Sequence, residues 1–137
     1  MESSPYLTFD GNCEQALGFY AATLGGTFEL VTRFGDMPGT DVAPQDRDRV
    51  GHARLLKDGK LVLMASDSWP GQHQGIQGFS MQTGWDDVET ARDFFLRISD
   101  GGEVVMDFAE TFWAKGFGLC RDRFGVGWMV NCDTETA

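Results

Sequence analysis

Two stretches of the chain, residues 12–24 and 86–98, carry apolar side chains every three to four positions. This spacing gathers the apolar side chains on one face and predicts two amphipathic helices. A pair of glycines follows each stretch, Gly25-Gly26 after the first and Gly101-Gly102 after the second, and glycine readily ends a helix. The apolar positions are Leu17, Tyr20, Ala21 and Leu24, then Val88, Ala91, Phe95 and Ile98.

Each predicted helix begins at a residue that can cap it. Asn12 is followed three positions later by Gln15, and Asp86 is followed three positions later by Glu89. In such a capping box the first side chain accepts a bond from the helix backbone, and the second side chain reaches back. We therefore expect a capping box at the start of both helices.

Apolar runs bounded by turn residues surround the helices and predict strands. One run precedes each helix and three follow it, so each half of the chain has the order βαβββ. The two copies lie about seventy-five residues apart, a period too long for a solenoid. The last run of each half ends near an aspartate, Asp67 or Asp133. The predicted strand regions are 5–12, 27–34, 50–56 and 57–67, then 78–83, 103–108, 117–122 and 121–133.

The duplicated order predicts an α+β fold in which tandem βαβββ modules form one domain, residues 1–137. Module one covers residues 5–67, module two covers residues 78–133, and residues 68–77 link them. Residues 35–49 lie outside the repeat, are polar and contain two prolines. They predict a long surface loop, either a floppy connection or a lid over a site.

The composition agrees with one globular domain. The chain has 137 residues, of which 42% are hydrophobic and 23% charged. Acidic residues outnumber basic ones 21 to 11, a net charge of −10, which argues against nucleic acid as a partner. No apolar run has the length of a membrane span, so no membrane partner is expected.

Two further features favour a cytoplasmic location. The N-terminal residues MESSPYL show no signal peptide. The three cysteines, Cys13, Cys120 and Cys132, are an odd number without a CxxC motif, which favours a reducing compartment. We expect the thiols to be small buried hydrophobes, with a reactive role as the alternative.

Four segments carry a resemblance to a known family: YLTFDGNCEQALGFY, LGG, LMASD and TFWAKGFGLCRDRFGVGWMVNC, spread from Tyr6 to Cys132. With the doubled βαβββ module, they resemble the PhnB-like branch of the vicinal oxygen chelate superfamily. That superfamily includes glyoxalase I, extradiol dioxygenases, and bleomycin- and fosfomycin-resistance proteins. The resemblance implies curled mixed sheets around a cavity, and a homodimer.

Many members of that superfamily bind a divalent metal through His, Glu or Gln on facing strands. Aligned on the resemblance, the ligand positions of this chain hold residues unsuited to a hard or borderline ion. We therefore predict no cofactor, with a divalent metal as the disfavoured alternative. These positions are Pro5, Leu63 or Met64, Phe79 or Ser80, and Met129.

Other residues could line a ligand cavity. Bulky aromatics with a few polar groups are typical of small-molecule sites, although core packing explains the aromatics equally well. His52 is either a hydrogen-bonded strand-edge residue or a polar group at the cavity mouth, and His73 lies in the linker. Asp67 ends a predicted strand, and a structural turn residue is the favoured alternative to a cavity role. The candidate cavity residues are His52, Met64, Asp67, Trp69, Phe112, Trp113, Cys120 and Trp128.

The sequence contains no motif for a nucleophile or a nucleotide. GxSxG is absent, and no GxGxxG follows a predicted strand into a helix. The ubiquinone-pathway methyltransferase label often attached to the PhnB-like branch therefore finds no support. We predict a protein that binds a small molecule in its sheet cavity without a metal. The alternatives are a metal-dependent lyase, isomerase or dioxygenase, and a protein of interaction alone, so enzyme status stays open.

Overall fold

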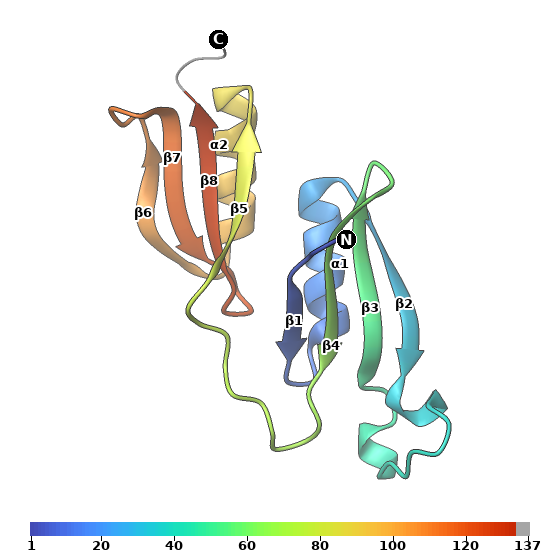
Figure 1. Cartoon of the computed structure of the whole chain (residues 1–137). Helices are drawn as coiled ribbons and strands as arrows, with labels where there is room; N and C mark the ends of the chain where they lie inside the picture. Colours follow the sequence, from blue (N-terminus) through green and yellow to red (C-terminus); the bar gives the residue numbers. More distant parts are fainter. Residues whose placement is uncertain (134–137) are drawn as a thin grey trace. The chain divides into compact units, whose positions relative to one another are not determined.

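The structure is a computed structural model that describes residues 1–133. It has the predicted βαβββ order twice, which confirms the tandem modules (Figure 1). None of the helices in the described part of the chain is long and apolar enough to cross a membrane. The first module consists of β1 (Tyr6–Phe9), α1 (Cys13–Leu24), β2 (Thr27–Arg33), β3 (Val50–Lys57) and β4 (Lys60–Asp67). The second consists of β5 (Ser80–Trp85), α2 (Val88–Ser99), β6 (Glu103–Ala109), β7 (Ala114–Arg121) and β8 (Gly127–Asp133).

Each module forms a four-stranded mixed sheet with one helix on it. The strand orders are β1-β4-β3-β2 and β5-β8-β7-β6, so the two sheets have the same topology. The pairs β1/β4 and β5/β8 are parallel, and the other neighbouring strands are antiparallel. The parallel pairs arise because the helix crosses over between the first and second strands of each module. The fold is therefore α+β, as the sequence predicts.

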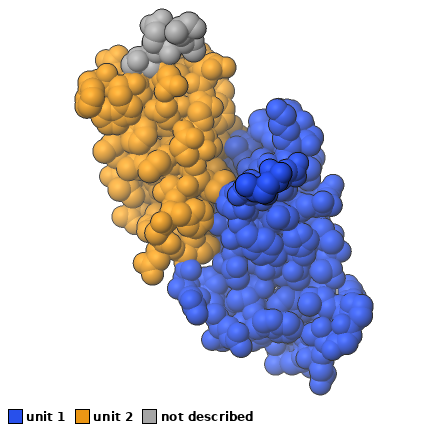
Figure 2. Space-filling view, viewed as in Figure 1, with its two compact units in different colours: residues 1–75 blue, residues 76–137 orange. Residues whose placement is uncertain are grey.

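The chain divides into two compact units, residues 1–75 and residues 76–137 (Figure 2). The boundary falls inside the predicted linker, residues 68–77. The extent of the single domain, residues 1–137, stays a prediction, and its last residues, 134–137, lie outside the described residues.

The predicted helix faces form the cores of the two units. In the first unit Leu17 and Tyr20 of α1 are fully buried, as are Leu55 and Leu63 in the strands. In the second unit the buried side chains of α2 include two that were not predicted, Phe94 and Ser99. They lie against buried strand residues such as Trp128, whose ring centroid is 6.0 Å from that of Phe94. The buried residues of α2 are Ala91, Phe94, Phe95, Ile98 and Ser99.

The repeated glycine pair has the same two causes in both units. Gly25 and Gly101 have φ angles of 75° and 79°, in the left-handed region that glycine adopts without strain. A Cβ on Gly26 would collide with the backbone oxygen of Leu56, and one on Gly102 would collide with that of Arg121. The first glycine therefore permits the turn, and the second permits close contact with the neighbouring hairpin.

The predicted capping boxes are wrong in both units. Asn12 does occupy the N-cap of α1, but its side chain makes no capping hydrogen bond. α2 is capped by Asp87 rather than Asp86, and its carboxylate accepts a 2.8 Å bond from the backbone N–H of Thr90. The reason is that β5 ends at Trp85, beyond the predicted end at Thr83, so the helix starts later.

The loop of residues 35–49 follows a defined path and includes two short 3-10 turns, η1 (Phe34–Asp36) and η2 (Pro44–Asp46). Arg49 ties it to its surroundings. Its guanidinium donates to Asp10 Oδ1 at 3.2 Å, Asp46 Oδ1 at 3.4 Å and the backbone oxygen of Ser68 at 3.1 Å. These contacts favour a tethered connection over a floppy one, and they leave the lid hypothesis untested.

Candidate ligand-binding site

Each sheet has one face against its helix and one face opposite, which we call the open face. Successive strand residues point to opposite faces, so the register identifies which side chains share the open face. In the first sheet a row crosses all four strands, and in the second sheet another row occupies the equivalent place. The first row is Tyr6, Met64, Arg54 and Glu29, and the second is Gln82, Met129, Leu119 and Met106.

The open face of the first sheet is polar. Arg54 pairs with Glu29, with Nη2 and Oε2 2.8 Å apart. Tyr6 Oη lies 3.1 Å from Nδ1 of His52, and the two rings stack with centroids 5.8 Å apart. Which of these two atoms donates depends on the histidine tautomer. His52 therefore belongs to a hydrogen-bonded side-chain pair on the open face.

The open faces do not offer a divalent ion the ligands it requires. Met64 and Met129 occupy equivalent positions, and both present a thioether, which suits soft copper rather than zinc, manganese or nickel. The residue opposite Met64 on β3 is Arg54, whose guanidinium has no acceptor atom to offer a metal. Within residues 1–133 no group of three or more His, Cys, Asp or Glu side chains is arranged to hold a metal ion.

The open face of the second sheet is apolar and ends in aromatic rings. Leu119, Met129 and Phe117 are half-buried on it. The ring of Trp113 stands edge-on to Phe117, with centroids 5.4 Å apart, and Phe112 lies 4.8 Å from Trp113. Phe112 is 94% exposed and Trp113 is 44% exposed, so these rings are available to another molecule.

Polar side chains interrupt this apolar face, Gln82 in the row itself and Asn131 beside it. Asn131 lies opposite Phe117 in the β7/β8 pair. Its Nδ2 donates to Asp133 Oδ1 at 2.8 Å, while its Oδ1 is buried without a hydrogen-bond partner among the described residues. A buried acceptor without a partner costs stability.

Of the predicted residues in the first unit, His52 and Met64 share the open face and the other two lie elsewhere. Asp67 is buried, and its carboxylate accepts bonds from the backbone N–H groups of Gly11, Cys13 and Val50 at 2.8–3.0 Å. This arrangement favours its alternative role as a structural turn residue. Trp69 packs on Phe34 beyond the sheet, with ring centroids 4.5 Å apart.

Of the predicted residues in the second unit, Phe112 and Trp113 lie together before β7, whereas Cys120 and Trp128 belong to the core. The latter two pair across β7 and β8, and both are buried. Trp128 Nε1 donates to Asp122 Oδ2 at 2.8 Å. Burial, and secondarily the charge of Asp122, raises the pKa of the Cys120 thiol to about 11. Both placements favour packing over ligand contact.

The sequence reasoning missed Tyr6 and Phe117. Each alternates with residues that face the helix, Tyr6 with buried Leu7, and Phe117 with buried Gly116 and Gly118. That alternation was a usable signal. It could not show that Tyr6 meets His52, because the two are 46 residues apart in the chain.

The fold and the sequence define the class of protein. Residues 4–130 match the family model described as the Glyoxalase/Bleomycin resistance protein/Dioxygenase superfamily, and the chain therefore belongs to that superfamily.

Individual relatives agree with this class. Protein YjdN of Escherichia coli (strain K12) is 34% identical over 96% of this chain and 95% of its own. The crystal structure of PA1353 from Pseudomonas aeruginosa is 42% identical, covers 97% of this chain and 98% of its own, and has a TM-score of 0.87. A Bacillus cereus structure described as a 3-demethylubiquinone-9 3-methyltransferase, PhnB protein, is 22% identical, covers 96% and 99%, and has a TM-score of 0.78. At that identity, the last likeness shows the fold alone.

Proposed function

We propose that the protein binds a small organic molecule on the open face of its second sheet, without a divalent metal. The observation that carries the proposal is the apolar row of Met129, Leu119 and Met106, extended by the rings of Phe117 and Trp113. An apolar surface with few polar groups is typical of small-ligand sites.

The surroundings of this face favour a flat ligand with a positive charge. Phe117 and Trp113 offer ring faces and edges to an aromatic or cationic group. Asp133 adds a carboxylate beside Asn131, from whose Nδ2 it accepts a hydrogen bond. The net charge of −10 attracts cations over a longer range.

The binding experiment uses two planar dyes of opposite charge, cationic thioflavin T and anionic 8-anilino-1-naphthalenesulfonate, titrated by fluorescence. We expect the cation to bind more tightly, and Phe117→Ala to weaken its binding about tenfold. Leu96→Ala, an exposed apolar change on α2, is the matched control and should leave binding unchanged. Equal binding to wild type and Phe117→Ala would rule out this face.

A separate experiment tests the absence of a metal. Protein purified without a His-tag or chelator is analysed for metals, then mixed with Ni²⁺, Zn²⁺, Mn²⁺ or Fe²⁺ while its melting temperature is followed. We expect no near-stoichiometric metal and no shift, because Met64 and Met129 are poor ligands for these ions. A rise of several degrees with one ion would instead support the alternative, a metal-dependent enzyme of the superfamily.

We also propose that the protein is a homodimer, as the family resemblance implies. Size-exclusion chromatography with light scattering would give the mass in solution, to be compared with 15.1 kDa for one chain. A mass of one chain across the accessible concentration range would contradict the proposal.

A further inference from the structure

The first unit contains a small hollow that is separate from the two open-face rows. It lies where the chain leaves β4, and we call it the linker pocket. Its volume is about 310 Å³, near the lower end for pockets that hold small ligands. Its apolar wall consists of Phe34, Met37 and Trp69, and its polar wall includes Thr8, Ser66 and Gln72.

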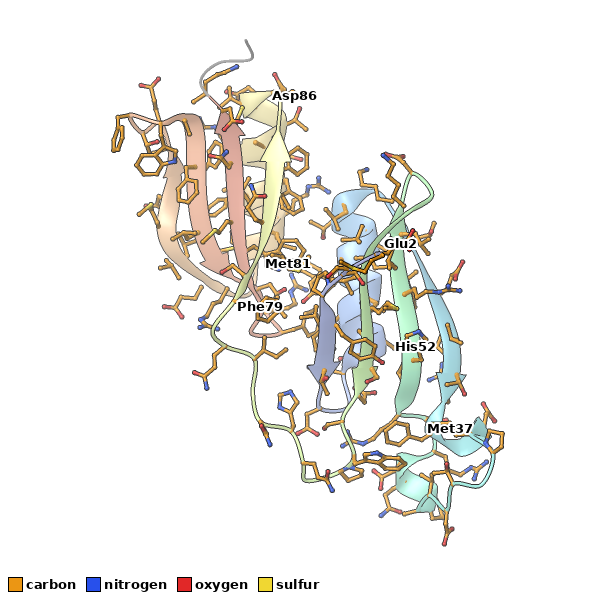
Figure 3. The ribbon with its side chains drawn as sticks, in the orientation of Figure 1. Glu2, Met37, His52, Phe79, Met81 and Asp86 are labelled. Carbon is orange, nitrogen blue, oxygen red and sulfur yellow. The ribbon has the colours of Figure 1, made fainter. Side chains whose placement is uncertain are left out.

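We propose that the linker pocket binds a small uncharged aromatic molecule with one hydroxyl group, about the size of phenol. An aromatic guest suits the wall, because Phe34 and Trp69 already pack with their centroids 4.5 Å apart and their rings inclined at 37°. The thioether of Met37, in the loop after β2, adds a polarizable surface (Figure 3). The volume leaves room for about a single ring.

The charges around the pocket argue for a neutral guest. Among its lining residues, Asp67 is the one with an ionisable carboxyl group. Both oxygens of that carboxylate already accept backbone bonds, Oδ1 from Gly11 and Cys13, and Oδ2 from Val50. An ionic guest would therefore lose hydration without gaining a free partner of opposite charge.

A hydroxyl on the guest would meet polar groups in the pocket. The hydroxyls of Thr8 and Ser66 belong to its lining. A guest hydroxyl can donate and accept, so it can bond to either of them whichever way the protein hydroxyl points.

The walls are held in place without a guest. The N–H of Ser68 donates to the backbone oxygen of Phe9 at 2.7 Å, and Arg49 Nη1 donates to the Ser68 oxygen at 3.1 Å. The N–H of Phe34 donates to the Arg49 oxygen at 2.8 Å. One arginine thus fixes both the loop that carries Phe34 and the segment that carries Trp69. A preformed pocket avoids the entropic cost of ordering its walls on binding.

The test follows 4-fluorophenol by ligand-observed ¹⁹F NMR. We expect saturable binding with a Kd on the order of one millimolar, as the size of the ligand allows. Trp69→Ala should weaken binding about tenfold. Leu96→Ala, at an exposed apolar residue of α2 that belongs to neither proposed site, is the control and should change the Kd less than about twofold.

Two further measurements make the proposal falsifiable. Ser66→Leu should block the pocket while leaving Trp69 in place, and 4-fluorobenzoate, a charged analogue, should bind far more weakly than the phenol. The proposal is overturned if 4-fluorophenol does not bind, if Trp69→Ala and Leu96→Ala have equal effects on its Kd, or if 4-fluorobenzoate binds as tightly as 4-fluorophenol. None of these outcomes bears on the dye site, which depends on Phe117.

Discussion

The two units share strand order, helix length and glycine pair, yet each buries its carboxylate in a different place. In the first unit Asp67 lies at the end of β4, opposite Phe9 of β1, and accepts three backbone bonds. In the second unit the equivalent position, opposite Trp85 of β5, is Cys132. The aspartate that the sequence repeat suggested, Asp133, comes one residue later and is exposed.

The second unit uses a different aspartate for the same purpose. Asp122 lies in the β7–β8 turn, where Oδ1 accepts bonds from the N–H groups of Phe124 and Val126, and Oδ2 accepts one from Trp128 Nε1. The turn that corresponds in the first unit needs no such carboxylate, because Asp58 and Gly59 form it with positive φ angles.

The comparison separates two kinds of constraint. A steric requirement, such as the space for Gly26 and Gly102, belongs to one position of the fold and recurs at the same place in both units. A polar requirement can be met from any position within hydrogen-bond reach, so the acceptor can differ between the units. The open faces differ even more, because one row contains the Arg54–Glu29 ion pair and the other contains three apolar side chains beside Gln82.

Removing the buried carboxylates should have the largest effect. Asp67→Ala and Asp122→Ala each leave buried donors without their acceptor, and we expect a loss of about 3–5 kcal/mol in the free energy of unfolding. Asp133→Ala is the control and should cost less than about 0.5 kcal/mol. Urea unfolding measures the free energy of unfolding of all three variants. If Asp133→Ala lost as much as the other two, Asp133 would carry the same structural role as Asp67, which the comparison of the units denies.

Replacing the second glycine of each pair should destabilise both units to a similar extent, because both positions have the same steric restriction. Gly26→Ala and Gly102→Ala force a Cβ against a backbone oxygen, and we expect each to cost about 2–3 kcal/mol in unfolding free energy. Gly84→Ala serves as control, because a Cβ there meets nothing within 4 Å. A large loss at one glycine and none at the other would show that the units do not share this constraint.

The N-cap side chains of the two helices should differ in how much they stabilise the protein. Asp87→Ala removes a cap that bonds the hydroxyl and N–H of Thr90, whereas Asn12→Ala removes no capping bond. We therefore expect the melting temperature to fall by a few degrees for the first variant and to stay almost unchanged for the second.

The Asp87 effect should depend on pH. Hydrogen bonds, first from the Thr90 hydroxyl and then from its N–H, lower the pKa of Asp87 from its ordinary 3.8. Its contribution is complete above the ordinary value and is lost as the pH falls through the lowered value. Melting curves between about pH 6 and pH 2 should show Asp87→Ala converging on wild type at the acidic end. A constant difference would contradict the role of the carboxylate.

The smallest difference between the units should be in the reactivity of their buried thiols, which we expect to be equally low. Burial, followed by the charges of Asp67 and Glu14, raises the pKa of Cys13 to about 12, and that of Cys120 is raised to about 11. At pH 8 roughly one thiol in a thousand or fewer is ionised, so 5,5′-dithiobis(2-nitrobenzoate) should react very slowly with these two in the native protein. All three cysteines should react at once in guanidinium, and rapid labelling of native Cys13 or Cys120 would contradict their burial.

The sequence was most informative about the elements and least informative about their junctions. The repeated order, both helices and the glycine pairs were predicted from local periodicity. The predicted start of α2 was wrong by one residue: the sequence predicted Asp86 as the N-cap, and the structure has Asp87. Both aspartates can cap a helix, and only the end of β5 decides between them. The same one-residue offset separates Cys132 from Asp133, and in a strand it reverses the face of the sheet.

By itself the sequence determined the α+β duplication, because apolar spacing and glycine sterics act over a few residues. The superfamily was indicated by the resemblance of four quoted segments to its PhnB-like branch. Tertiary structure decided which polar groups meet. Tyr6 reaches His52 across 46 residues, and Asp67 reaches Cys13 across 54. Arg49 joins Asp10 to the segment that carries Trp69. These contacts depend on strand register and on packing, which bring together residues that no local pattern connects.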